Sequence, residues 1–172
     1  LPRRIVIAAG STCTSAGLLL GLALAAEDIG VPTPELVAVR VTPWPVTAPS
    51  RIAGLAAKAG VLLESLGGRA APYGRLRGGL RVEGAQLGRG YGVPTLAGEA
   101  AIAELRPVNP VKLDTTYSAK AAAAAFAVAG DGPTLLWATK SQAPLIQASA
   151  ERLAAAPVRM RRWLELSPTQ AR

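Results

Sequence analysis

Histidine is absent from the 172-residue sequence, and cysteine occurs once, at Cys13. A chain without histidine cannot build a Ser–His–Asp triad, and most zinc sites need histidine or several cysteines, so we expect no metal site. A single cysteine cannot form a disulfide within the chain. This is compatible with a reducing compartment, and we expect a cytoplasmic protein, although one cysteine alone does not decide the compartment.

Long apolar runs are also missing. The sequence has no run of about 18 uninterrupted apolar residues, so a membrane-spanning helix is not supported and no membrane partner is expected. Arg3 and Arg4, followed later by the apolar run Leu18–Ala26, imitate a secretory signal peptide. Largely polar or small residues separate the basic pair from that run, which argues against a signal peptide.

Aromatic residues make up only 4% of the chain, whereas its formal net charge is +8. This charge invites a nucleic-acid interpretation, because arginines cluster in residues 69–89 and again in residues 159–172. Only Tyr73, Tyr91 and Trp163 accompany these clusters, so a platform for stacking bases is not evident. We therefore expect no nucleic-acid partner.

The composition is that of a globular protein, with 50% hydrophobic and 17% charged residues. Near the start, the β-branched run Ile5–Ile7 gives way to a Gly/Ser/Thr turn at Gly10–Ser15 and then to an apolar pattern of helical length. In such strand–loop–helix units, N–H groups of the loop and of the helix start converge, and an anion such as phosphate fits there. Gly/Ser-rich turns also occur for reasons of turn geometry alone, so both interpretations stand at this point.

Two nucleotide-binding motifs are excluded for this loop. The G-x-x-x-x-G-K-[ST] loop needs a lysine where Leu18 stands. The G-x-G-x-x-G fingerprint needs a glycine where Thr12 stands.

The pattern after the first helix predicts an α/β protein with an open, mostly parallel sheet flanked by helices. The first helix should end near residues 28–30, and Leu36–Thr42 is typical of a buried strand. Ser50 is the expected N-cap of a helix at Arg51–Leu66. Residues 67–92 are rich in glycine, which indicates loops with a short strand or hairpin at Gly79–Val82. The apolar residues expected on one face of the helix at Arg51–Leu66 are Ile52, Leu55, Val61, Leu62 and Leu66.

The second half continues the alternation of helices and strands. Helices are predicted at Leu96–Leu105 and from Tyr117 through Phe126, where a run of alanines favours helix. A strand follows at Thr134–Thr139 and a last helix at Pro144–Ala155. We expect an α/β portion over residues 1–156 and a basic tail over residues 157–172.

Three segments resemble one enzyme family and occur in its order. A-G-S-T-C-T-S-A-G-L at Ala9–Leu18 resembles the S-G-S-x-G-T-x-A-G-L phosphate loop of the D-cysteine desulfhydrase and 1-aminocyclopropane-1-carboxylate (ACC) deaminase family, with Cys13 replacing the second glycine. G-Y-G-V-P-T at Gly90–Thr95 is a second segment, and L-D-T-T-Y-S-A-K at Leu113–Lys120 is similar to the family's D-P-V-Y-[TSE]-G-K. The resemblance covers most of the chain.

The resemblance implies a tryptophan synthase beta-like (fold type II) α/β fold and a pyridoxal-phosphate cofactor in an enzyme of amino-acid metabolism. It implies that Tyr117 and Tyr91 face the substrate as catalytic residues, and that the hydroxyl of Ser118 meets the ring nitrogen of the cofactor. The remaining cofactor-binding residues implied by the phosphate loop are Gly10, Ser11, Thr12, Cys13 and Thr14.

The residue at position 118 bears on the reaction. A hydroxyl can donate to an unprotonated ring nitrogen, whereas the glutamate of the deaminase pattern would keep that nitrogen protonated. Ser118 therefore favours desulfhydrase-like α,β-elimination, giving a keto acid and ammonia, over opening of a cyclopropane ring.

Each of these residues also has a purely structural interpretation. Tyr117 could simply pack its ring, and Tyr91 could be a loop anchor between two glycines. We expect Cys13 to be a small buried apolar residue rather than a nucleophile. For Lys120 the structural interpretation is a solvated helix charge, and we do not propose it as the Schiff-base lysine.

The lysine that forms the Schiff base has no match in this sequence. In the family it lies upstream of the phosphate loop, whereas Lys58, Lys112, Lys120 and Lys140 all lie downstream of it. The family's H-[TL]-G-G turn also reads T-K-S-Q at Thr139–Gln142. We expect an incomplete enzyme that needs an N-terminal portion or a partner chain. The alternative is a non-catalytic phosphate-ligand-binding homologue or partner subunit.

The expected partners follow from this incompleteness. A small amino acid is the expected substrate, and a homodimer is the expected assembly. Because the cofactor cleft in such folds lies between two α/β units, this chain alone should leave apolar surface uncovered.

Overall fold

The computed structural model describes residues 1–108, 112–130, 132–139 and 148–166. The chain forms two units, Leu1–Ser141 and Gln142–Arg172. The second unit contains the short helices α6 (Ala150–Ala154) and α7 (Val158–Leu166), so the basic segment expected at residues 157–172 is helical over part of its length. Within the described residues, no helix has the length and apolar character needed to cross a bilayer.

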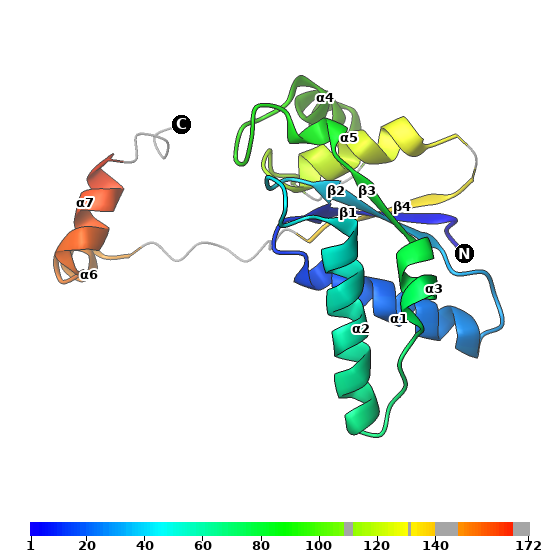
Figure 1. Cartoon of the computed structure of the whole chain (residues 1–172). Coiled ribbons are helices and arrows are strands. Elements are labelled where there is room, and N and C mark those ends of the chain that lie inside the picture. The colour runs from blue at the N-terminus through cyan, green and yellow to red at the C-terminus, as the bar shows by residue number, and fades with distance from the viewer. Residues whose placement is uncertain (109–111, 131, 140–147, 167–172) are drawn as a thin grey trace. The chain divides into compact units, whose positions relative to one another are not determined.

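The first unit is built on a four-stranded sheet whose order is β3-β2-β1-β4. All neighbouring strands are parallel, with Ile5 of β1 in register with Leu36 of β2 and with Leu135 of β4. The prediction of an α/β fold with an open parallel sheet flanked by helices is confirmed (Figure 1). The strand bounds are β1 (Arg4–Ala9), β2 (Glu35–Arg40), β3 (Leu80–Glu83) and β4 (Thr134–Trp137).

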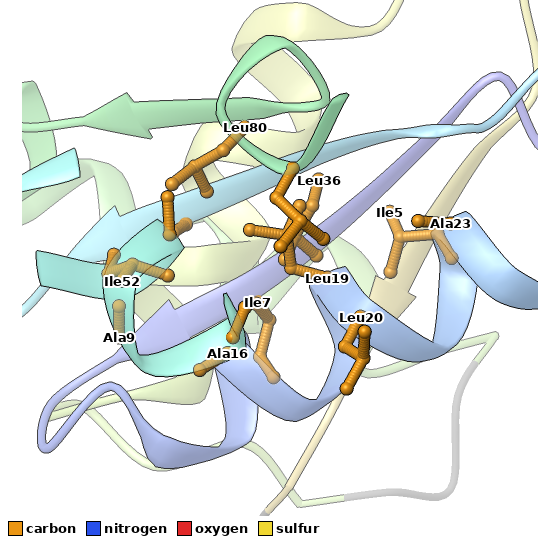
Figure 2. Close-up of a cluster of buried hydrophobic side chains, with 14 of the residues drawn as sticks. Ile5, Ile7, Ala9, Ala16, Leu19, Leu20, Ala23, Leu36, Ile52 and Leu80 are labelled. Atoms are coloured by element: carbon orange, nitrogen blue, oxygen red, sulfur yellow. The ribbon is translucent and has the colours of Figure 1, made fainter. Parts of the chain in front are cut away.

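One face of the sheet is covered by the helices that connect β1 to β2 and β2 to β3 (Figure 1). Side chains alternate between the two faces of a strand, so Ile5 and Ile7 of β1 both point to this face. There they pack with Leu19 and Ile52 in the larger apolar core (Figure 2). The helices of this layer are α1 (Cys13–Asp28), α2 (Pro49–Ser65) and α3 (Tyr73–Gly78).

The opposite face is covered by α5 (Ser118–Val128), with α4 (Leu96–Leu105) packed beside it (Figure 1). Val6 and Val37, which point away from the first layer, pack against Ala121 and Ala124 of α5. Alanine side chains are small, so α5 lies close to the sheet. The two helices also approach closely, because a Cβ added to Gly98 would lie 3.4 Å from that of Ala119.

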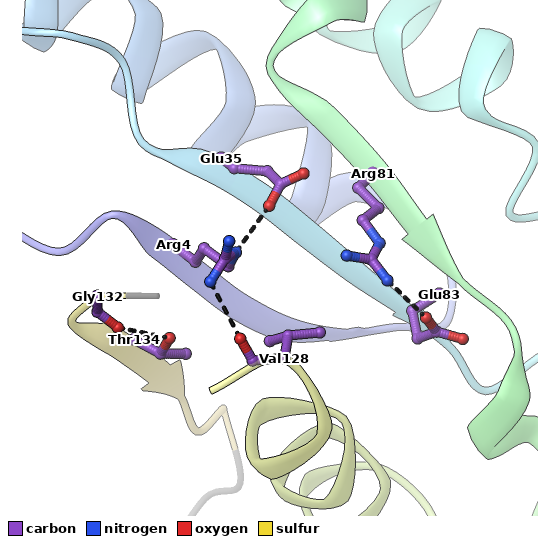
Figure 3. Close-up of polar contacts among 7 residues, drawn as sticks. All are labelled: Arg4, Glu35, Arg81, Glu83, Val128, Gly132 and Thr134. Carbon is purple, nitrogen blue, oxygen red and sulfur yellow. Dashed lines mark hydrogen bonds and ion pairs between the residues drawn. The ribbon is translucent and has the colours of Figure 1, made fainter. Parts of the chain in front are cut away.

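Polar contacts join the end of α5 to the first strand. The Arg4 guanidinium donates to the Glu35 carboxylate and to the Val128 carbonyl, each at 3.0 Å (Figure 3). Figure 3 also shows an ion pair on β3 between Arg81 and Glu83, at 3.3 Å. Arg4 therefore ties β1 both to β2 and to the helix that precedes β4.

The element bounds agree closely with the sequence predictions at several places. The first helix ends at Asp28, and α4 spans Leu96–Leu105 as predicted. The strand predicted at Gly79–Val82 is β3, and it pairs in parallel with β2. Strand β4 is shorter than predicted and ends at Trp137.

Two helix predictions were wrong in detail. Helix α2 begins at Pro49, so Ser50 is not its N-cap, since proline's fixed φ suits the first helical position. Its predicted apolar face is buried only in the first half: Ile52 is inaccessible, whereas Val61, Leu62 and Leu66 are exposed. The second half of α2 extends past the sheet, which leaves these residues without a surface to cover (Figure 1).

Two further helices differ from the prediction. Helix α3 was missed, because its sequence Y-G-R-L-R-G carries two glycines that disfavour helix. The last predicted helix, Pro144–Ala155, is described only from residue 148. There α6 begins at Ala150, and the Ser149 hydroxyl accepts the Arg152 N–H as its cap.

Candidate functional site

The strand order locates the candidate site. In open parallel sheets, ligands bind beyond the carboxyl ends of the strands, where neighbouring strands connect to opposite sides of the sheet. In the order β3-β2-β1-β4 that point lies between β1 and β4. The loop beginning at Gly10 follows β1, and Thr139 follows β4.

The loop after β1 leads into an uncapped helix. Thr12 occupies the N-cap position of α1 with φ 73°, and no side chain caps the helix. Its hydroxyl donates instead to the Ser11 carbonyl at 2.6 Å. The first bond of the helix runs from Ala16 N–H to Thr12 O at 2.9 Å, so the N–H groups of the three residues before Ala16 have no acceptor within the helix. These groups point out of the start of α1 and can bind an anion.

The side chains around this helix start suit an anion as well. Ser11 and Thr14 are exposed, and the first turn contains no acidic residue. The Ser15 hydroxyl oxygen is buried and has no hydrogen-bond partner among the described residues. Cys13 is exposed, so the expectation of a buried apolar cysteine is wrong. As the first residue of α1, Cys13 points outward and cannot reach the core.

A second turn lies beside this loop, at the start of α5. The Asp114 carboxylate accepts the backbone N–H groups of Thr116, Tyr117 and Ser118 at 3.0, 2.7 and 3.2 Å. Burial alone raises the pKa of Asp114, but these bonds and one from the Ser118 hydroxyl together hold it below its usual value. The aspartate is therefore ionised at neutral pH and fixes the start of α5.

Ser118 is engaged within this turn. Its hydroxyl donates to the Asp114 carboxylate at 2.6 Å and accepts the Asp114 N–H at 2.7 Å. The side chain is also buried, at 3% exposure. A hydrogen bond from Ser118 to a cofactor nitrogen, as the resemblance implies, would require the bond to Asp114 to break, so this role stays a prediction.

Tyr117 lies over the loop that follows β1. A Cβ added to Gly10 would lie 3.2 Å from Tyr117 Cε1, so a larger residue there would require the ring to shift by a few tenths of an ångström. Tyr91 meets Tyr117 edge-on, with ring centroids 6.0 Å apart at 77°, and the two hydroxyls are hydrogen-bonded. That bond, together with burial and the negative charge of Asp114, raises the pKa of Tyr117, whose phenol is therefore protonated at neutral pH.

The loop that carries Tyr91 depends on glycine. Gly90 and Gly92, on either side of the tyrosine, have φ of 144° and 76°, which side chains with a Cβ rarely adopt. Tyr91 itself is 53% exposed. The structure thus brings together the two tyrosines that the sequence singled out, and places them next to the loop beginning at Gly10.

A cavity of about 420 Å³ opens at this place. Its described lining comes from Asp114, Thr116 and Tyr117 at the start of α5 and from Thr139 after β4. The rest of the T-K-S-Q segment, including Lys140, lies outside the described residues. The cavity is at the switch point of the sheet and is large enough for a small molecule.

The three described lysines differ in their surroundings. Lys58 and Lys112 are exposed, and Lys58 lies on α2 in the layer beneath the sheet. Lys120 is fully buried, so its interpretation as a solvated helix charge is wrong. Its ammonium donates to the carbonyls of Leu87 and Gly90.

The hydrogen bonds of Asp114 and the burial of Lys120 were not predicted from the sequence. Aspartate is a turn residue whose side chain bonds backbone N–H groups a few positions on, and the L-D-T-T-Y-S segment offers this signal. No local pattern marks Lys120 as buried, because the carbonyls that it binds are about 30 residues away in the sequence.

The fold and the site define an α/β protein with an open helix N-terminus at the switch point of a parallel sheet, similar to the family that the three motifs resemble. The chain is similar to a solved structure described as "Crystal Structure Analysis of the ACC deaminase homologue", with 25% sequence identity and a TM-score of 0.58. This finding confirms the resemblance to the D-cysteine desulfhydrase and ACC deaminase family. The match covers 78% of this chain and 38% of that chain. No family model and no curated protein matches the chain.

Proposed function

We propose that this chain is the phosphate-binding portion of a pyridoxal-phosphate-dependent enzyme that acts on a small amino acid by α,β-elimination or deamination. The observation that carries the proposal is the uncapped N-terminus of α1 at the switch point of the sheet, adjacent to the Tyr91–Tyr117 pair. Pyridoxal phosphate supplies an electron sink for the carbanion formed at the amino acid's α-carbon.

The chain's own residues have separate roles in this proposal. The N–H groups at the start of α1, with the exposed side chains of Ser11, Cys13 and Thr14, bind the phosphate. Tyr117 holds its proton at the phenol oxygen at neutral pH, which suits a proton donor better than a base. Tyr91, bonded to that oxygen, orients the phenol.

The residues fit the two ends of the cofactor unequally. The helix start suits the phosphate, whereas the Ser118 hydroxyl is bonded to Asp114 and the Lys120 ammonium is bonded to two backbone carbonyls. We therefore propose that the Schiff-base lysine comes from an N-terminal portion of the same enzyme or from a partner chain. The match to 38% of the solved homologue supports this view.

The finer properties are part of the same proposal. D-cysteine is the proposed substrate type, with a keto acid and ammonia as products, and the proposed setting is a cytoplasmic homodimer. The exposed apolar residues at the end of α2 are compatible with surface that a further portion covers.

A second candidate is a non-catalytic phosphate-ligand-binding homologue or partner subunit. The Ser118 hydroxyl and the Lys120 ammonium, which are both bonded within the chain, favour it. It shares the phosphate site with the first candidate and differs only in lacking turnover.

The experiment uses the complete gene product that contains this chain. It is incubated with pyridoxal phosphate and D-cysteine, and keto acid and ammonia are measured, with binding of pyridoxal phosphate and of phosphate-free pyridoxal followed in parallel. Turnover supports the enzyme. Tight binding of the phosphorylated form alone without turnover supports the second candidate, and equal binding of both forms contradicts both candidates.

A further inference from the structure

The buried Lys120 is the most unusual charged group among the described residues. Its exposure is 0%, and its ammonium donates to the Leu87 carbonyl at 2.9 Å and to the Gly90 carbonyl at 3.2 Å. In the part of the chain that the structure describes, no carboxylate pairs with it. Burial lowers the pKa of Lys120.

Such a group is costly for a fold to keep. Removing an ammonium from water without a counter-ion opposes folding, and an apolar side chain of similar size often stabilises such a site. The surrounding residues of α5 are alanines that pack on the sheet and on α4, so an apolar residue at position 120 would suit the local pattern. The lysine therefore has a use other than packing.

The positions of the two carbonyls that Lys120 binds indicate its role. Leu87 ends the short 3₁₀ helix η1 (Ala85–Leu87), and Gly90 immediately precedes Tyr91. Between them lie Gly88 and Arg89, which are both exposed. Gly88 also lies close to Thr95, and the Gly90 carbonyl accepts a longer bond from the Val93 N–H at 3.4 Å. Lys120 thus binds the carbonyls at both ends of residues 87–90, which directly precede the exposed Tyr91.

The same helix start holds the other member of the tyrosine pair. Tyr117 is the N-cap residue of α5, and Lys120 follows three positions later, which places both on one side of the helix. One rigid element therefore carries Tyr117 and the group that holds the loop of Tyr91.

We propose that Lys120 is a positioning residue, which clamps the segment 87–90 against α5 so that the Tyr91 hydroxyl meets that of Tyr117. It acts on the site through these two backbone carbonyls and does not touch the substrate. The use of the tyrosine pair in catalysis rests on the proposed function, whereas the clamp is tested on the 172-residue chain without cofactor or substrate. The two can therefore fail separately.

The test compares Lys120→Met with the unaltered chain. Methionine keeps much of the length of the side chain and removes its charge and its donors. Amide hydrogen exchange in residues 88–92 should rise by at least about tenfold, because two charge-assisted hydrogen bonds that hold the segment are lost. The midpoint of thermal unfolding should stay the same or rise, because an unpaired buried charge is removed.

A second readout reports on the tyrosine pair directly. Ultraviolet titration of the phenols is done in a Tyr73→Phe background, so that only Tyr91 and Tyr117 contribute. Lys120→Met should lower the pKa of Tyr117 toward the value found in Tyr91→Phe, since both changes remove the bond between the hydroxyls. A lysine that served packing alone would leave this titration unchanged.

Lys58→Met is the matched control, because Lys58 is an exposed helical lysine on the other layer. The proposal is overturned if Lys120→Met shows the same exchange in residues 88–92 and the same Tyr117 titration as Lys58→Met. Should Lys120→Met fail to fold, Lys120→Gln is measured instead. Its shorter, neutral side chain cannot span both carbonyls, so faster exchange is again expected, and unchanged exchange again overturns the proposal.

Discussion

Replacing Thr14 with aspartate should affect phosphate binding at the start of α1 and the stability of that helix in opposite directions. Thr14 is exposed in the first turn, where the structure has no acidic residue and no side-chain cap. An aspartate there interacts favourably with the helix dipole, by about 0.3–1 kcal/mol. Thr14→Asp should therefore unfold at the same denaturant concentration as the unaltered chain or at a higher one.

The same change should weaken binding of a phosphate ligand. Two unit charges about 4 Å apart interact by about 1 kcal/mol even in bulk water, and a phosphate carries a charge of about −1.5 to −2. The repulsion is then about 1.5–2 kcal/mol, or a loss of about 10- to 30-fold in affinity.

The assay is calorimetric titration of the chain with pyridoxal phosphate at fixed ionic strength, with inorganic phosphate as competitor. Thr14→Asn is the matched control, since asparagine has the shape of aspartate without its charge and should bind within about threefold of the unaltered chain. If Thr14→Asp binds as tightly as Thr14→Asn, the anion does not lie at the start of α1. The phosphate-binding assignment is then refuted.

Three further outcomes are expected. Asp114→Asn should lower the free energy of unfolding at pH 7 by about 1–2 kcal/mol, because the hydrogen bonds to the turn become weaker. The pKa of Asp114 in the folded chain lies below 3.8, so the difference between the two proteins should be present above pH 3.8 and should vanish as the pH falls through the pKa of the folded chain. Denaturant unfolding at several pH values measures this difference. In the complete enzyme, Tyr117→Phe should reduce turnover by about 10²- to 10⁴-fold while cofactor affinity is kept, and turnover at the native rate would contradict the proton-donor role. Ile52→Ala, at a fully buried position, should cost about 2–5 kcal/mol of unfolding free energy, whereas Leu62→Ala on the exposed half of the same helix should change it by less than about 0.5 kcal/mol, and similar losses would contradict the burial of α2.

The class of the sheet and the bounds of several elements were predictable from the sequence, whereas the order of the strands was not. The β-branched run at Ile5–Ile7 and the glycine-bounded turn after it are local signals, and they mark β1 and the loop correctly. The tyrosines were found because their segments resemble a family, and the structure brings them together.

What local patterns missed depends on distant parts of the chain. Periodicity predicts that Val61 and Leu62 share one apolar face of the helix, but it does not show that α2 extends past the sheet and leaves them exposed. The burial of Lys120 depends on a loop far away in the sequence. The sequence does not show that the Ser118 hydroxyl is hydrogen-bonded to Asp114, so it offered this hydroxyl as a ligand-binding group.

The central position of β1 in the sheet also determines when this protein can fold. Ile5 pairs with Leu36, about 30 residues along the chain, but its other partner, Leu135, is about 130 residues away. Closing the longer loop costs about 1.3 kcal/mol more in chain entropy than closing the shorter one. During synthesis β2 is therefore available to pair with β1 before β4 is, and until then the other edge of β1 is unpaired. A nascent chain that stops short of Thr134 keeps that edge open, and its free N–H and C=O groups favour pairing with strands of other chains.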